Sequence, residues 1–188
     1  MKKQFSFIFL GLIFVMIDVW IKGYDVVPDV VGYILIGLGT SGLQPYSIHF
    51  VTARNLSWAL AVFTLMLIFV RGQAFFFSDL VVRVIDLGFF WFLLGGIREL
   101  ALSKDRKDLA AAASRDRIIY IVLMLSTALG ILLFKDRVQA MGTFQLVVQV
   151  GLLIVLILIL NLVRESRKYL TSEPIISASE PDSPASGS

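Results

Sequence analysis

The sequence predicts an all-α protein, a polytopic bundle of about six transmembrane helices with both termini on the cytoplasmic side. Hydrophobic residues make up 57% and charged residues 16% of the 188 residues, and the mean hydropathy is +0.85. A soluble domain is typically about 45–50% apolar and about 25% charged. Apolar stretches that approach the length needed to cross a bilayer recur along the chain, and basic residues gather on alternate connections. These observations indicate a chain solvated by lipid.

The first two predicted spans cover residues 5–21 and 30–43. The first follows Lys2 and Lys3 and has no small-residue cleavage pattern after it, so we interpret it as an uncleaved helix. The second is short and contains four glycines, so a re-entrant segment is the alternative to a full crossing. Pro28 suits the first turn of this second helix, because proline lacks the amide hydrogen that a first turn leaves unused.

Four further spans are predicted at residues 56–70, 80–97, 118–134 and 143–163. Residues 44–57 are expected to form a polar connector. Residues 98–117 are expected to form a charged cytoplasmic connector, made of helical extensions or a short helix. Residues 164–188 should form a cytoplasmic tail, disordered from about residue 173, because its Ser-, Pro- and Glu-rich composition cannot offset the entropy cost of ordering.

The basic residues predict the orientation of the bundle. With six crossings, twelve of the 17 Lys and Arg residues fall on one side and five on the other. Because Lys and Arg accumulate on the cytoplasmic side of a membrane protein, the richer side, which holds both termini, is inside. Six aspartates fall at or near the opposite face. The expected location is therefore the cell membrane, with any polar site toward its outer face.

One local motif stands between the first two spans. The run Gly23-Tyr24-Asp25-Val26-Val27-Pro28-Asp29-Val30-Val31-Gly32-Tyr33 resembles a G-[FY]-D-x-[LV]-P-D-x-[IV]-G-Y signature of small, uncharacterised multi-pass membrane proteins of Gram-positive bacteria. The resemblance implies a bacterial source and a multi-pass architecture, and it implies no activity. Two interpretations of the motif remain open. It shapes a tight helical hairpin with Asp29 at the positive end of the second helix, or Asp25 or Asp29 acts directly.

Three charges fall inside predicted spans, at Asp18, Arg83 and Asp86. A charge at the centre of a membrane helix costs on the order of 2.5–3.5 kcal/mol on insertion scales and usually faces protein or water. Arg83 and Asp86 stand three positions apart, so they share a helix face and can pair. Asp18 is expected at a similar depth. The three residues form either a buried ion pair or triad that fixes helix packing, or a proton, ion or substrate site.

The glycines predict close helix packing. Residues 37–42 match G-x-G-x-x-G, but the run lies inside an apolar span without the strand and acidic residue that a dinucleotide site needs, so small-residue packing is the better interpretation. A weak repeat displaced by 56 positions relates Gly32-Tyr33 to Gly88-Phe89. This repeat suggests a bundle built from αα-hairpins.

No catalytic, metal or cofactor site is predicted. The chain has no cysteine and a single histidine, His49, which we expect to be an ordinary polar loop residue. No nucleic-acid binding is expected, because the cytoplasmic basic residues are interspersed with acids. The candidate functional or structural polar cluster consists of Asp18, Asp25, Asp29, Arg83 and Asp86.

Three classes of function fit these features. We expect a non-enzymatic membrane protein that binds or stabilises a partner in the bilayer, either another membrane protein or a second copy of the chain. The first alternative is a small transporter or channel that uses Asp18, Arg83 and Asp86. The second is an enzyme that modifies lipids or envelope precursors at the outer face.

Overall fold

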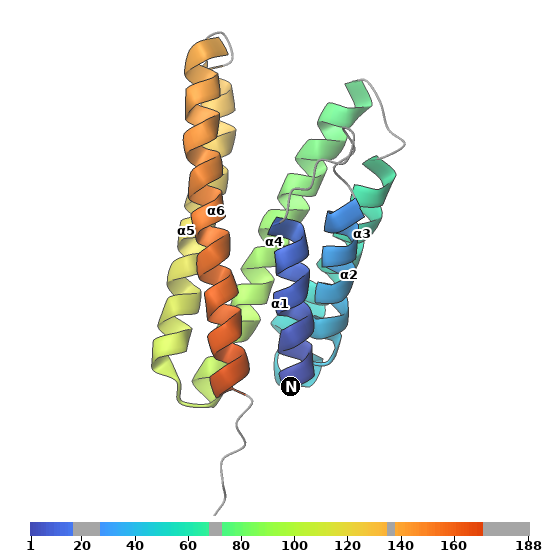
Figure 1. Cartoon of the computed structure of the whole chain (residues 1–188), viewed down its shortest axis with the longest axis vertical. Coiled ribbons are helices and arrows are strands. Elements are labelled where there is room, and N and C mark those ends of the chain that lie inside the picture. The colour runs from blue at the N-terminus through green and yellow to red at the C-terminus, as the bar shows by residue number, and fades with distance from the viewer. Residues whose placement is uncertain (17–26, 68–72, 135–137, 171–188) are drawn as a thin grey trace, which may run out of the picture.

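The computed structural model describes residues 1–16, 27–67, 73–134 and 138–170, and within these ranges it contains helices and no strand (Figure 1). The six α-helices and one short 3-10 helix are α1 (Lys2–Met16), α2 (Val27–Ser41), η1 (Gln44–Tyr46), α3 (Ile48–Leu67), α4 (Gln73–Ser103), α5 (Lys107–Phe134) and α6 (Val138–Tyr169). The all-α prediction is therefore confirmed. Asp18 and Asp25 lie outside the described residues.

The helices form a closed ring. Each α-helix packs against the next one in sequence, and α6 returns to pack against α1. In Figure 1 the hairpin of α5 and α6 stands apart from α1, α2 and α3 toward the upper end, while α4 runs obliquely between the two groups. The beginning of α1, the end of α6 and the turn between α4 and α5 all lie at the lower end. The described ends of the chain thus share one end of the bundle.

Glycines bring α1 and α2 into backbone contact. A methyl group on Gly39 would lie 2.6 Å from the carbonyl oxygen of Gln4, and one on Gly32 would lie 2.8 Å from the carbonyl oxygen of Gly11. Side-chain carbons in proteins do not approach carbonyl oxygens so closely, so only glycine fits at these positions. Small residues therefore serve close helix packing, the role expected for the glycines of the second span.

Phenylalanines dominate the interior of the bundle, and Phe5, Phe50, Phe89 and Phe90 are almost fully buried. Large apolar side chains are also exposed along the outer faces, at Phe63, Met66, Val84, Trp91, Leu125, Leu146 and Ile154 among others. They lie on four different helices, α3, α4, α5 and α6. Among the described helices, the part of α6 from Leu146 to Tyr169 is long and apolar enough to cross a bilayer, with a mean hydropathy of 3.0 over its most apolar window. These features indicate membrane association.

The stretches at residues 44–57 and 98–117, between predicted spans, are largely helical. The polar stretch at residues 44–57 is not a loop, because η1 is followed at once by α3, whose first turns carry the polar residues. The charged stretch at residues 98–117 consists of the end of α4, a tight turn and the beginning of α5. In this turn Asp105 has a φ of 52° and the Arg106 amide donates a 2.9 Å hydrogen bond to the Ala101 carbonyl, a pattern that terminates helices.

Candidate functional site

A carboxylate in the interior of the bundle joins three helices. Asp86 of α4 accepts a 3.0 Å hydrogen bond at Oδ1 from the Tyr33 hydroxyl of α2. Its other oxygen, Oδ2, accepts a hydrogen bond from the Tyr120 hydroxyl of α5. We call these three residues the Asp86 cluster. Both carboxylate oxygens thus have a hydroxyl donor, and each donor comes from a different helix.

Aromatic packing positions the two tyrosines. Tyr33 and Tyr120 are only 6% and 2% exposed, whereas Asp86 is partly buried. The Tyr33 ring meets Phe89 edge-on with ring centroids 6.1 Å apart, and the Tyr120 ring lies 4.4 Å from that of Phe90. The tyrosine rings are therefore fixed by apolar contacts, and their hydroxyl groups are directed at the carboxylate.

Ser57 and Arg83 also interact with members of the Asp86 cluster. The Ser57 hydroxyl of α3 donates a 2.5 Å hydrogen bond to the Tyr33 carbonyl oxygen, which ties α3 to the same point of α2. Arg83 lies one helical turn before Asp86 and attracts its carboxylate electrostatically. The Asp86 cluster links α2, α4 and α5, and Ser57 adds α3 through Tyr33. The Asp86 carboxyl group can hold either a negative charge or a proton.

The structure describes three of the five expected polar residues, namely Asp29, Arg83 and Asp86. Arg83 and Asp86 act on each other, as their spacing predicts. Asp29 stands in the first turn of α2, where a negative charge is favoured by the helix dipole, and it lines a cleft between α1, α2 and α6. Asp18 and Asp25 fall outside the part of the chain that the structure describes, so their relation to Asp86 stays a prediction.

Tyr33 and Tyr120 were not predicted to be members of the site. A usable signal was present, because a tyrosine inside an apolar span carries a hydroxyl that needs a partner. Asp86 is one of the few acceptors available at that depth. Periodicity within one helix does not show which residue of another helix supplies the partner.

A cleft lies beside Asp29 at the beginning of α2. It has a volume of about 510 Å³ and lies between the end of α1, the beginning of α2 and the middle of α6. Its lining residues are Val15, Met16, Asp29, Leu146, Gln149, Val150, Leu152, Leu153 and Leu156. Among these described residues, the walls are apolar except for the Asp29 carboxylate and the Gln149 amide.

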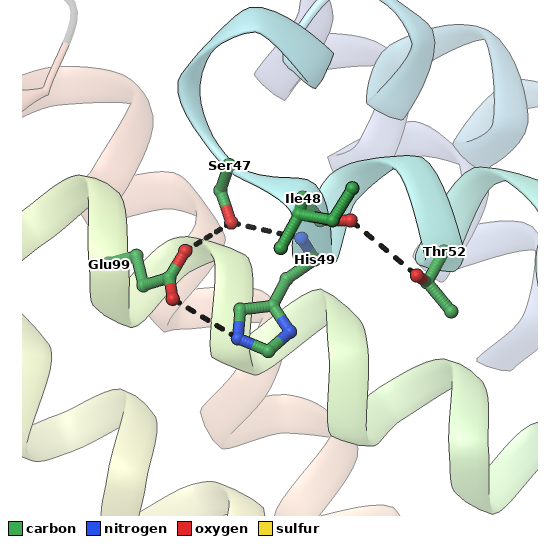
Figure 2. Close-up of polar contacts among 5 residues, drawn as sticks. All are labelled: Ser47, Ile48, His49, Thr52 and Glu99. Atoms are coloured by element: carbon green, nitrogen blue, oxygen red, sulfur yellow. Dashed lines mark hydrogen bonds and ion pairs between the residues drawn. The ribbon is translucent and has the colours of Figure 1, made fainter.

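A second polar group fastens α3 to α4 at the lower end of the bundle (Figure 2). His49 Nε2 lies 3.2 Å from Glu99 Oε1, and the Ser47 hydroxyl donates a hydrogen bond to Glu99 Oε2. The Ser47 oxygen also accepts a 3.1 Å hydrogen bond from the His49 backbone amide, which caps α3. His49 is therefore a helical residue with an acidic partner, and the expectation of a polar loop residue is wrong.

This Ser47, His49 and Glu99 group does not have the geometry of a nucleophilic triad. In a triad the imidazole contacts the serine oxygen, whereas here the imidazole and the hydroxyl both contact the carboxylate. His49 Nδ1 is buried and has no hydrogen-bond partner. Within the described ranges no three acidic, histidine or cysteine side chains are placed to hold a metal ion. No family model, curated protein or solved structure matches the chain.

Proposed function

We propose that the chain is an integral membrane protein of the cell membrane with six spans and both termini cytoplasmic, and that it binds a hydrophobic partner without catalysing a reaction. The observation that carries the proposal is the apolar cleft between α1, α2 and α6. Its volume of about 510 Å³ falls within the range of roughly 300–1,000 Å³ that is usual for small-molecule sites. In the proposed bundle, the exposed apolar side chains Leu146, Val150 and Leu153 of its α6 wall would face the lipid phase.

The helix lengths and surface support six crossings. α4, α5 and α6 have 31, 28 and 32 residues, and at about 1.5 Å per residue each exceeds a hydrocarbon core of about 30 Å. α1 and α2 have 15 described residues each and would span most of that core. Exposed apolar side chains on α3, α4, α5 and α6 suit contact with lipid.

The charge distribution supports the proposed orientation. The lower end of the bundle contains the beginning of α1, the turn between α4 and α5 and the end of α6. These segments contain most of the twelve basic residues that the sequence analysis assigns to the inner side. Arg117 of α5 lies 3.0 Å above the Trp91 ring of α4, a cation–π contact between these two helices.

Binding is favoured over catalysis because the buried hydroxyl groups already donate hydrogen bonds to carboxylates of the protein. The hydroxyls of Tyr33 and Tyr120 are already used by Asp86, and the Ser47 hydroxyl is used by Glu99. The cleft, in contrast, presents mainly apolar side chains, of which Leu146 is 64% and Leu153 is 45% exposed. Such a surface gains free energy when an apolar molecule covers it and offers little chemistry to a substrate.

Filling the cleft tests this proposal. The protein is purified from its membrane after mild crosslinking, and the hydrophobic molecules and proteins that remain bound are quantified by mass spectrometry. Leu153→Trp should lower the stoichiometry of the bound partner several-fold. Leu125→Trp is the matched control, since Leu125 is an exposed leucine of α5 that does not line the cleft. Absence of any stoichiometric partner, or equal retention by both variants, would contradict the proposal.

A specific observation favours a transporter as the second candidate. Asp86 lies in the membrane-embedded part of the proposed bundle with two hydroxyl donors and with Arg83 nearby, a setting typical of proton-coupled sites. Reconstitution in liposomes with an imposed proton gradient would reveal coupled flux. If flux is absent, or is unchanged by Asp86→Asn, the transporter candidate is rejected.

A further inference from the structure

Two arginines of neighbouring helices lie close together on the surface of the bundle. Arg98 of α4 is exposed and Arg117 of α5 is half-buried. The Arg117 guanidinium lies 3.0 Å above the ring of Trp91, which shares a face of α4 with Arg98 because the two residues are seven positions apart. Burial lowers the pKa of the Arg117 guanidinium, and repulsion by the nearby charge of Arg98 lowers it further. The two guanidinium groups therefore form a local concentration of positive charge.

The acidic residues beside these arginines in the sequence are bound by other groups. Glu99 accepts a hydrogen bond from the Ser47 hydroxyl and lies 3.2 Å from the His49 imidazole. The Asp116 carboxylate, which is only 1% exposed, pairs with Arg115 at 2.9 Å. Both carboxylates are thus already engaged, so an added anion can bind at the two guanidinium groups without displacing either carboxylate.

The Arg117 guanidinium has hydrogen-bonding capacity that the described residues do not use. Its Nε is buried and has no hydrogen-bond partner among the described residues. A guanidinium presents five N–H donors in a planar fork that matches two oxygens of a phosphate group. A phosphate that accepts hydrogen bonds from Arg117 beside Arg98 would also offset the repulsion between the two positive charges. The arrangement therefore favours an anion with several oxygen acceptors.

Exposed apolar side chains flank the two arginines. Trp91 of α4 is 41% exposed and Ile118 of α5 is 61% exposed. Arg98 directly follows the fourth predicted span and Arg117 directly precedes the fifth. In the proposed bundle the arginines would therefore stand at the level of the lipid head groups, and the apolar side chains would face the acyl chains. A phosphate that carries acyl chains suits this setting better than a free phosphate, because the lipid would contact both kinds of side chain.

We propose that Arg98 and Arg117 bind the phosphate of an anionic phospholipid in the inner leaflet, with Trp91 beside its acyl chains. The inner-leaflet location rests on the proposed function, which places this part of α4 and α5 at the cytoplasmic surface. The lipid site is separate from the cleft, because the cleft is lined by residues of α1, α2 and α6.

Lipid binding by the purified full-length protein tests this site. The protein in detergent is incubated with dioleoylphosphatidylglycerol or dioleoylphosphatidylcholine, which share their acyl chains, and the retained lipid is counted by native mass spectrometry. One basic residue near a lipid surface strengthens the binding of anionic lipid by about fivefold, so wild-type protein should prefer phosphatidylglycerol by at least about tenfold. Inorganic phosphate at the same concentration should not displace the bound lipid.

Substitutions separate the two arginines from general electrostatics. Arg98→Gln and Arg117→Gln should each lower the preference for phosphatidylglycerol by about fivefold, and the double variant should abolish it. Arg117→Lys keeps the charge but loses the planar fork, so its preference should fall between those of wild-type protein and Arg117→Gln. Arg54→Gln is the matched control, since it removes the same charge from α3 and should leave the preference unchanged.

The wild-type comparison decides the question even if a variant fails to fold. Equal retention of the two lipids by wild-type protein would overturn the site, and so would an equal loss of preference in Arg54→Gln and Arg117→Gln. Displacement of the lipid by inorganic phosphate would overturn the assignment to a lipid. Leu153→Trp should leave the preference for phosphatidylglycerol unchanged, so failure of the lipid site and failure of the proposed function are observed separately.

Discussion

Tyr33 and Asp86 are 53 positions apart in the sequence, and the Tyr33 hydroxyl donates a 3.0 Å hydrogen bond to the Asp86 carboxylate. Tyr120 donates to the other oxygen of the same carboxylate. One acidic side chain of α4 therefore holds α2 and α5 in register with each other. Because the two hydroxyls share an acceptor, removal of either one changes the surroundings of the other.

Loss of the tyrosine hydroxyls should weaken the bundle in a non-additive way. Tyr33→Phe and Tyr120→Phe should each lower the free energy of unfolding by about 0.5–1.5 kcal/mol, the usual net contribution of one hydrogen bond. The double variant should differ from the sum of the single variants by at least about 0.5 kcal/mol, because both bonds end on Asp86. Unfolding titrations in detergent micelles measure all three values. Strict additivity would show that the hydroxyls do not share the carboxylate.

Adding one methyl group at the contact between α1 and α2 should destabilise the protein. Gly39→Ala places a carbon 2.6 Å from the Gln4 carbonyl oxygen, so the two helices must separate, at a cost of about 1–3 kcal/mol. Gly88→Ala is the matched control, since its nearest neighbour would be Leu56 Cδ1 at an ordinary 3.5 Å. This control should be neutral or stabilising, because alanine favours a helix over glycine by about 1 kcal/mol. Thermal unfolding of the two variants side by side tests the difference, and equal melting temperatures would contradict it.

Glu99 should stabilise the packing of the beginning of α3 against α4. Glu99→Ala removes the acceptor of the buried Ser47 hydroxyl and the partner of His49 together, so it should cost about 1–2 kcal/mol of unfolding free energy. Glu99→Gln keeps an oxygen for Ser47 and should cost less. Denaturant unfolding of both variants provides the measurement. Equal losses in Glu99→Gln and Glu99→Ala would show that the negative charge, and not the acceptor for Ser47, dominates.

Asp108 should titrate at unusually low pH in the turn between α4 and α5. Its hydrogen bonds with the Arg106 guanidinium, at 2.7 and 3.0 Å, lower the pKa of the carboxyl to about 2. An unperturbed aspartate titrates near about 3.9, so the stabilisation by this pair is complete above that pH and is lost as the pH falls toward 2. Carbon-13 NMR of labelled aspartate carboxyls follows this titration. In Arg106→Gln the Asp108 pKa should rise toward its ordinary value, and an unchanged pKa would rule out the arginine as the cause.

Much of the helical framework could be predicted from the sequence. Long apolar runs and their polar interruptions gave helices that overlap each predicted span, and the glycines of the second span pointed to close packing. The beginning of α3 was missed because its first turns carry His49, Arg54 and Asn55. Polar residues at a helix end resemble a loop when only composition is considered, although the Ser47 cap marks the true beginning.

The candidate site was only partly predictable. A charge in an apolar segment stands out, so Asp86 and Arg83 were identified and do act on each other. The tyrosine donors were not identified, because contact between α2, α4 and α5 depends on how the ring of helices closes. The cleft at Asp29 was also beyond prediction, since its walls come from α1, α2 and α6, which are far apart in the sequence.

The most direct test of the account is the transmembrane topology. The chain has no cysteine, so single cysteines can be introduced and labelled in intact cells with a membrane-impermeant maleimide. Cysteines at Lys22 and Lys135, which the charge distribution assigns to the outside, should be labelled before the cells are opened. Cysteines at Tyr46 and Lys104, in the turns at the inner end, should be labelled only afterwards. Labelling at Lys104 in intact cells, or none at Lys135, would contradict a six-span bundle with both termini inside.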